Sequence, residues 1–336
     1  MKAFVVFSLV ALTLYSASGC SDAKDLIELG LDPPGRESID VSRMGVNNFF
    51  VNSEFGSISE QFRDINETLG LNYVRVLFAW TDDVQPTPSS PVSVDFFDRI
   101  LAAIPPGVDV LIVVAHTPSW MGRSSNWIDG DPRRTWVEFW FRPLVERYAN
   151  TPGIVGWEIW NEPDRTLFAS DAALGLEDPA NYFDLLTIAS PVIRNTDPNA
   201  LVVMAATESI QQNFPVKLNY NKQLRDLGAE DFIDVWNVHY YGTSFESVIT
   251  NNGVGDFLNG LRVPIWITES GEQGPTQQLP YVETAWPFLR QEVPGIDRIY
   301  YFEYGSAAEL SVNYGLRTTN AEFPVSDLYI YLRDQG

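Results

Sequence analysis

The stretch Trp157-Glu158-Ile159-Trp160-Asn161-Glu162-Pro163 decides the fold class of this chain. It is rich in large apolar residues, which is typical of a buried strand, and it stops at an Asn-Glu pair followed by proline. Because proline has no N–H to donate to a neighbouring strand, the strand is predicted to end there. The pattern therefore predicts a carboxyl group at the C-terminal end of a buried strand.

A second stretch, Val263-Pro264-Ile265-Trp266-Ile267-Thr268-Glu269, ends in a similar way and is followed by a turn at Gly271. In α/β barrels the loops after the strands carry the chemistry. Two glutamates at two strand ends therefore predict a pair of carboxyl groups facing one pocket. Such a pair is the machinery of glycoside hydrolysis.

Strand-like and helix-like segments alternate from Met44 onward. Several strand candidates, such as residues 110–115, are continuous apolar runs, as expected for parallel strands covered by helices. In residues 135–149 the apolar side chains recur at helical spacing instead. The predicted strands are 44–51, 72–79, 109–116, 154–161, 200–207, 234–241, 264–269 and 297–303, and the predicted helices include 135–149, 180–194, 281–291 and 326–334.

Eight such alternations predict one α/β domain, a single (β/α)8 TIM barrel over residues 41–336. The competing fold is a doubly wound open sheet. No glycine-rich phosphate loop follows the first predicted strand, which disfavours that fold.

Composition and charge exclude several classes of partner. The chain has 44 acidic and 22 basic residues and a net charge of −22, which argues against nucleic acid and anionic membrane surfaces. Hydrophobic residues make up 45% of the sequence, enough for a sizeable core.

The N-terminus carries a targeting pattern over residues 1–19. A positive charge at Lys2 precedes the apolar run 3–15, and three small residues, 17–19, precede Cys20, the only cysteine. This segment resembles a bacterial lipoprotein signal, which implies lipidation of Cys20. That family usually has Leu where this chain has Ala17, and ordinary signal cleavage with secretion fits the same small residues. Residues 20–40 are predicted to be a polar tether.

At Glu162 and Glu269 the sequence resembles the glycoside hydrolases of clan A, the retaining (β/α)8 barrel enzymes that include families 5 and 39. In that clan Asn-Glu-Pro follows the fourth strand and Thr-Glu follows the seventh, as in this chain. The resemblance runs from about residue 44 to residue 334. It implies that Glu162 is the general acid/base and that Glu269 is the nucleophile.

The resemblance also implies residues that support the catalytic pair and bind the sugar. Arg75 would hydrogen-bond the nucleophile and keep it ionised, and Tyr241 would hold it through its hydroxyl. Asn161 would bind the 2-hydroxyl of the sugar. The remaining expected contacts are His116 and Trp120 after the third strand, His239 on the sixth, and Phe302 or Tyr304 at the eighth, where clan members commonly have tryptophan.

These observations predict a retaining glycoside hydrolase that cleaves β-glycosidic bonds, endo-acting on a polysaccharide. The alternatives are an exo-acting β-glycosidase, a transglycosylase, and a non-catalytic surface glycan-binding protein. The partner is expected to be a β-linked polysaccharide or oligosaccharide, with cellulose-like glucan, xylan, mannan, β-1,3-glucan and bacterial exopolysaccharide all open.

No cofactor is expected, because two histidines and one cysteine do not make a zinc set. A carboxylate-only magnesium or calcium site stays open. We expect a monomer at the bacterial cell envelope, bound to a membrane only through a lipid at Cys20, or periplasmic or secreted without it.

Overall fold

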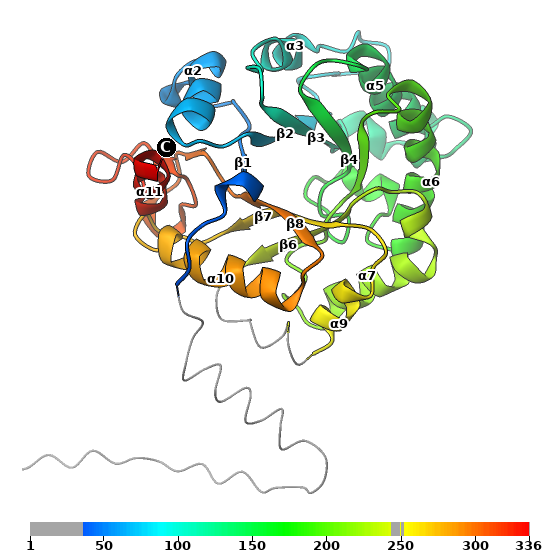
Figure 1. The fold of residues 1–336 in the computed structure, drawn as a ribbon. Helices are drawn as coiled ribbons and strands as arrows, with labels where there is room; N and C mark the ends of the chain where they lie inside the picture. The colour runs from blue at the N-terminus through cyan, green and yellow to red at the C-terminus, as the bar shows by residue number, and fades with distance from the viewer. Residues whose placement is uncertain (1–35, 243–248, 250–251, 336) are drawn as a thin grey trace, which may run out of the picture. The chain divides into compact units, whose positions relative to one another are not determined.

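A computed structural model describes residues 36–242, 249 and 252–335 (Figure 1). The predicted signal peptide, Cys20 and most of the predicted tether lie outside these residues. Among the helices of the described part, none has the length and apolar character needed to cross a bilayer.

Eight parallel strands form one sheet in the order β5-β4-β3-β2-β1-β8-β7-β6 (Figure 1). Strand β1 pairs with both β2 and β8, and a parallel bridge between Val203 and Val235 joins the β5 and β6 sides. This nearly closed ring confirms the predicted (β/α)8 barrel and excludes the open sheet. The strands are β1 (Met44–Asn47), β2 (Tyr73–Ala79), β3 (Asp109–Ala115), β4 (Ile154–Ile159), β5 (Leu201–Met204), β6 (Trp236–Tyr241), β7 (Ile265–Gly271) and β8 (Ile296–Tyr301).

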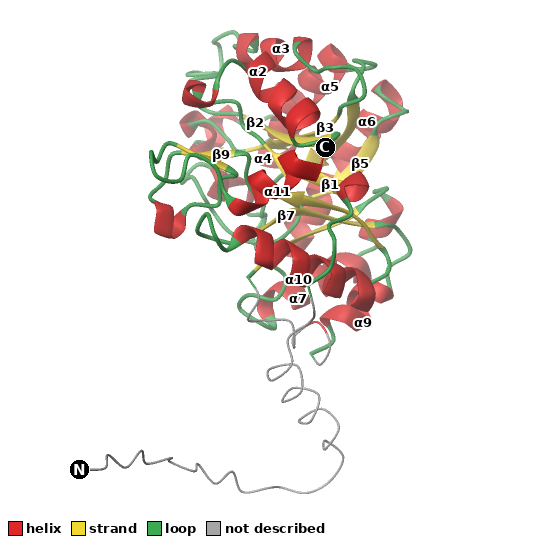
Figure 2. Cartoon of the chain, turned by 60° about the vertical axis from the view of Figure 1, so that its left-hand side comes forward, coloured by secondary structure: helices red, strands yellow, loops and turns green. Residues whose placement is uncertain are grey.

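Helices surround the strands, as Figure 2 shows in red around yellow. The predicted helix 135–149 is present as α4, a π turn over Val137–Phe141, and α5. The other three predicted helices correspond to α6, α10 and α11. The helices are α2 (Ile58–Arg63), α3 (Asp95–Ala102), α4 (Pro132–Trp136), α5 (Arg142–Tyr148), α6 (Pro179–Thr196), α7 (Val216–Asp226), α9 (Val254–Asn259), α10 (Gln278–Glu292) and α11 (Asp327–Gln335), and the short strands β9 (Gly305–Ser306) and β10 (Arg317–Thr318) pair separately.

Polar side chains cap the starts of several helices, α2 and α6 among them. Ser57 and Glu60 form a reciprocal capping box at α2, so that two backbone N–H groups at its start find acceptors. At α6 the side chain of Asp178 accepts from the N–H of Ala180, and Pro179 occupies the first helical turn.

Large side chains fill the interior of the barrel. Leu111, Val203, Val235, Trp266 and Tyr300 form one buried cluster. A side chain at Gly45 would overlap the buried Tyr300 ring, so β1 needs glycine at this point. Because the interior is packed, the room for a substrate is at the ends of the strands.

Three non-glycine residues at the C-terminal ends of β3 and β4 have positive φ angles: His116 at 69°, Trp160 at 77° and Glu162 at 45°. This left-handed conformation is costly for such side chains and collects at functional sites. The turn at Trp160 also ends β4 at Ile159, two residues earlier than predicted.

Candidate active site

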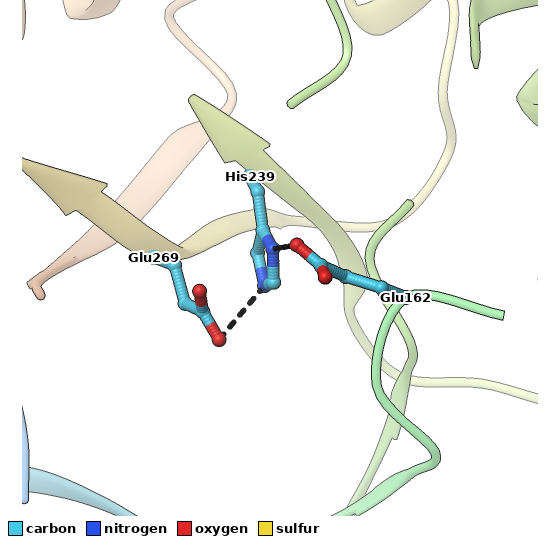
Figure 3. A group of neighbouring side chains, drawn as sticks. All are labelled: Glu162, His239 and Glu269. Carbon is cyan, nitrogen blue, oxygen red and sulfur yellow. Dashed lines mark hydrogen bonds and ion pairs between the residues drawn. The ribbon is translucent and has the colours of Figure 1, made fainter. Parts of the chain in front are cut away.

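Glu162 and Glu269 meet at the C-terminal end of the barrel, with His239 between them (Figure 3). One carboxylate oxygen of each glutamate and a ring nitrogen of His239 all lie within 4.8 Å of one another. Glu162 follows β4, whereas Glu269 lies within β7, directly beside His239 of β6 in the strand register. The glutamates are only 8% and 7% exposed, so little water surrounds their charges.

Two donors hold the carboxylate of Glu269. Nη1 of Arg75 donates to Oε1 at 2.7 Å, and the hydroxyl of Tyr241 donates to Oε2 at 2.8 Å. Burial works against the charged form, but His239, Arg75 and Tyr241 together outweigh it and lower the pKa of Glu269. The carboxylate is therefore ionised near neutral pH, as a nucleophile must be.

Arg75 is itself clamped in the barrel. It makes two hydrogen bonds to Glu158, at 2.7 and 2.9 Å, and one each to Asn47 at 2.9 Å and Asn161 at 2.7 Å. Burial opposes its charge, but the Glu158 and Glu269 carboxylates raise the pKa of Arg75 above its usual value. Sequence reasoning gave Glu158 no supporting role, although a charged residue inside an apolar strand was the signal for one.

His239 is fully buried and bridges the two catalytic candidates. Its Nδ1 lies 3.0 Å from Oε1 of Glu162, and its Nε2 lies 3.6 Å from Oε1 of Glu269. Burial alone would lower the pKa of His239, but the neighbouring Glu269 and Glu162 carboxylates outweigh it and raise that pKa. This geometry places His239 between the two carboxylates, and its sugar contact stays a prediction.

The two residues predicted after the third strand have different surroundings. Nδ1 of His116 lies 3.0 Å from Oδ2 of Asp171, and its ring meets the edge of the half-exposed Phe168. Trp120 is 6% exposed, donates its indole N–H to a backbone carbonyl and packs against Trp80. These are the contacts of a packed side chain, and the sugar contact of Trp120 stays a prediction.

The two aromatic candidates that follow the eighth strand, Phe302 and Tyr304, differ in exposure. Phe302 is partly exposed, and its ring contacts the edge of Tyr241 with the centroids 6.1 Å apart. Tyr304 is fully buried and donates its hydroxyl to Asp64 at 2.8 Å. Tyr304 therefore packs in the protein interior, whereas Phe302 lies beside Tyr241, the residue that holds Glu269, and a sugar contact of either ring stays a prediction.

A third carboxyl group lies near the catalytic pair. Burial raises the pKa of Glu303 to about 7, and the charge of Glu269 adds to this effect. Glu303 follows Phe302 after β8, so a neutral carboxyl group is close to the site at mildly acidic pH.

A hollow of about 640 Å³ opens beside His116 at the same end of the barrel. Asp171 anchors one of its walls, because it accepts from the hydroxyl of Thr117 after β3 and from the backbone N–H of Phe168. Polar side chains and one half-exposed ring therefore share this space. The lining residues are Thr81, Asp82, Asp83, Thr117, Ser119, Gly122, Phe168, Ala169 and Ser170.

Glu162, His239 and Glu269 lie close enough to offer one ligand each to a metal ion. Two guanidinium groups already pair with these carboxylates, Arg75 with Glu269 and Arg165 with Glu162, each at 2.7 Å. Positive charge at that distance repels a cation. The described residues therefore suit a pair of catalytic carboxyl groups better than a metal centre.

Known proteins share this architecture. A probable mannan endo-1,4-β-mannosidase F from Aspergillus flavus is 22% identical over 223 residues, which cover 62% of this chain and 43% of that protein. The chain thus matches less than half the length of this relative.

Two solved structures resemble the barrel. A family 39 glycoside hydrolase from Bacteroides cellulosilyticus WH2 superposes with a TM-score of 0.60 at 19% identity, covering 89% of this chain and 64% of that one. A monomeric β-xylosidase from Caulobacter crescentus CB15 gives a TM-score of 0.64 at 16% identity, covering 90% and 69%.

The family match is more extensive. Residues 35–301, most of the chain, match the Cellulase family, glycosyl hydrolase family 5. Because this match spans well over half of the sequence, the chain belongs to the Cellulase family, glycosyl hydrolase family 5.

Proposed function

We propose that this protein is a retaining endo-glycanase that cleaves β-linked polysaccharides by double displacement. Glu269 attacks the anomeric carbon while Glu162 protonates the leaving oxygen, and a covalent glycosyl-enzyme forms. Glu162 then removes a proton from the water that releases the sugar. The anomeric configuration is thereby inverted twice and retained.

The separation of the two carboxylates is the observation that carries this proposal. One carboxylate oxygen of Glu162 lies within 4.8 Å of one carboxylate oxygen of Glu269. Retaining enzymes place the two groups about 5–5.5 Å apart, and inverting enzymes need about 6.5–9.5 Å to seat a water. The gap here suits direct attack by Glu269.

The neighbours of Glu269 suit the same reaction. Arg75 and Tyr241 stabilise the carboxylate before attack and position its oxygens. Because Arg75 is fixed by Glu158 and two asparagines, it cannot follow the carboxylate if that group moves. The nucleophile is thus held in one orientation.

Endo action is supported by the hollow beside His116, which follows β3 at the end of the barrel where Glu162 follows β4. Phe168, 44% exposed, offers a ring to the apolar face of a sugar, and Asp82, Asp83 and Ser119 offer polar groups to its hydroxyls. Such a space suits further sugar units of a polymer. A β-1,4-linked backbone is the first choice, because the mannan endo-1,4-β-mannosidase is among the relatives.

The test is a panel of mannan, cellulose-type glucan, xylan and β-1,3-glucan, assayed with the wild type, Glu269→Gln and Glu162→Gln. Glu309→Gln, an exposed glutamate after β8, is the matched control. We expect the first two variants to lose at least a thousandfold in kcat on the cleaved polymer and the control to lose nothing. Undiminished activity in Glu269→Gln would refute the nucleophile assignment.

Product analysis separates the alternatives. Proton NMR of the first product should show the β anomer, whereas the α anomer would indicate inversion. A fall in viscosity that precedes most of the release of reducing ends indicates endo action, and single sugars from the outset indicate an exo-enzyme. Products longer than the substrate would indicate a transglycosylase, and glycan affinity without cleavage would indicate a binding protein.

We also propose that Cys20 carries a lipid that attaches a monomeric enzyme to the cell envelope, on the basis of the sequence pattern alone. Metabolic labelling with a fatty acid should mark the wild type and not Cys20→Ser. Label in both, or in neither, would contradict the anchor. Light scattering of the released protein tests the monomer.

A further inference from the structure

The acid/base Glu162 has a partner that the reaction outlined above does not use. Nη2 of Arg165 lies 2.7 Å from Oε2 of Glu162. The backbone brings the two together, because the N–H of Arg165 donates to the carbonyl of Glu162 at 3.2 Å and closes a turn after β4. The Arg165 side chain is 44% exposed, so it reaches Glu162 from the solvent side.

Arg165 has a second acceptor beside the first. Its Nη1 lies 3.1 Å from Oε1 of Glu208, in the loop after β5. Lys217 of α7 pairs with the other oxygen of Glu208 at 2.7 Å and also with Asp164. Burial opposes the charge of Glu208, but Lys217 and Arg165 outweigh it and lower the pKa of Glu208. Glu208 therefore stays ionised as an acceptor for Arg165.

The contact with Arg165 conflicts with the first chemical step. A general acid must carry the proton that it gives to the leaving oxygen. A guanidinium group has only donors, so it stabilises the ionised carboxylate and opposes a proton on Oε2. The ion pair with Arg165 therefore suits the second step, in which Glu162 acts as a base. Arg165 has to release Glu162 before the first step, in which Glu162 gives up a proton.

Three charged or titratable side chains lie next to the carboxylate of Glu162. His239 of β6 faces Oε1, and Glu269 of β7 lies across the gap. Arg165 faces Oε2. The other charged groups act through these three: Arg75 of β2 through Glu269, and Glu208, Asp164 and Lys217 through Arg165. Of these, Arg165 is the exposed cation bonded directly to the carboxylate, so it is the group whose movement changes the charge balance at Glu162.

We propose that Arg165 is a positioning residue that pairs with Glu162 in the resting enzyme and moves fully to Glu208 when Glu162 takes up its proton. This inference rests on the proposed role of Glu162 as the acid/base. Its consequence is that Arg165 opposes proton donation by Glu162, an effect that should appear only with substrates whose leaving group needs that proton.

The experiment compares the pH profiles of kcat/KM for two substrates. One is the tetrasaccharide of the polymer that the wild type cleaves, whose leaving group needs a proton. The other is the 2,4-dinitrophenyl glycoside of the same sugar, whose leaving group departs without one. The variants are Arg165→Gln, Arg165→Lys, and Arg123→Gln as a control that removes the same charge from the exposed loop after β3.

With the tetrasaccharide, we expect the basic limb of the kcat/KM profile to lie about 0.5–1 pH unit higher in Arg165→Gln than in the wild type. The reason is that a neighbouring cation favours the ionised carboxylate, and the exposure of Arg165 weakens the effect. Activity on the alkaline side then rises about threefold to tenfold. Arg165→Lys and Arg123→Gln should keep the wild-type limb. An unmoved limb in Arg165→Gln, or an equal shift with the dinitrophenyl glycoside, would overturn the proposal.

Two further results keep the inference distinct from the proposed function. If Glu162 is not the acid/base, Glu162→Gln retains activity on the tetrasaccharide and the wild-type profiles for the two substrates coincide. If Glu208 is the alternative acceptor, Glu208→Gln should keep Arg165 paired with Glu162 and shift the basic limb of the kcat/KM profile to lower pH. An upward shift would contradict the role of Glu208. Thermal unfolding of each variant checks that the fold is intact.

Discussion

Replacing Tyr241 with phenylalanine removes one hydroxyl from the site and keeps the ring that packs it. The hydroxyl donates to Oε2 of Glu269 at 2.8 Å, and the ring contacts Phe302 and Tyr314 edge-on. The change should therefore act on the charge of the nucleophile and leave the aromatic packing in place.

The size of the effect follows from the charge on the acceptor. A hydrogen bond to an ionised group contributes about 1.5–3 kcal/mol, which corresponds to about one to two pKa units for Glu269 at about 1.36 kcal/mol per unit. The pKa of Glu269 is lowered in the folded protein, partly by this bond. Its loss moves that pKa up, so the nucleophile becomes protonated at higher pH.

The assay is the pH dependence of kcat/KM on the dinitrophenyl glycoside, which needs no general acid. The acid limb of Tyr241→Phe should lie about one to two units above that of the wild type. Tyr314→Phe, which takes a hydroxyl from the adjoining ring, should leave the limb in place. An unchanged acid limb in Tyr241→Phe would refute the idea that this hydroxyl keeps Glu269 ionised.

Three other substitutions test the framework. Gly45→Ala should destabilise the fold by about 1–3 kcal/mol in urea unfolding, because the new methyl group overlaps the Tyr300 ring, whereas Gly122→Ala, which has open space, should not. Phe168→Ala should raise KM for tetrasaccharides about threefold to tenfold and leave KM for aryl glycosides unchanged. Equal effects on both substrates would contradict a contact between Phe168 and the sugar. Arg75→Gln should lower the free energy of unfolding by about 3–5 kcal/mol at pH 7, since two buried carboxylates lose their partner. The loss should be smaller at pH 4, where protonation removes the charge of these carboxylates, and a loss that does not depend on pH would contradict this.

The sequence was sufficient to locate the two glutamates at the barrel end because strand ends can be read from local patterns. An apolar run that stops at Glu162 before a proline, and another that stops at Glu269, both mark the C-terminal ends of strands. In a parallel barrel all such ends share one face. The convergence of the two carboxyl groups follows from the topology, without knowledge of any side-chain contact.

The burial of individual aromatic rings could not be predicted from strand-end patterns. Trp120 and Tyr304 lie close in sequence to His116 and Phe302, yet both turn into the protein and hydrogen-bond there. Which way a ring points after a strand depends on the local turn and on the space left by neighbours such as Trp80. That information comes from the packed core and is absent from strand-end patterns.

Hydrogen-bond and ion-pair partners that are distant in sequence could not be predicted either. Asp171 meets His116 from 55 residues away, and Arg165 bridges Glu162 and Glu208 across two loops. With 44 acidic residues in the chain, charge alone could not select these pairs. Only the folded loops after β4 and β5 bring them together.

The most direct measurement of the central claim is the site of covalent labelling by a slowly hydrolysed substrate, a 2-deoxy-2-fluoro dinitrophenyl β-glycoside of the preferred sugar. Mass spectrometry of the labelled, digested protein locates the sugar on one side chain. Attack by Glu269 predicts one glycosyl group on that residue and none on it in Glu269→Gln. A sugar found on Glu162 or Glu303, or inactivation with no covalent sugar at all, would contradict the account.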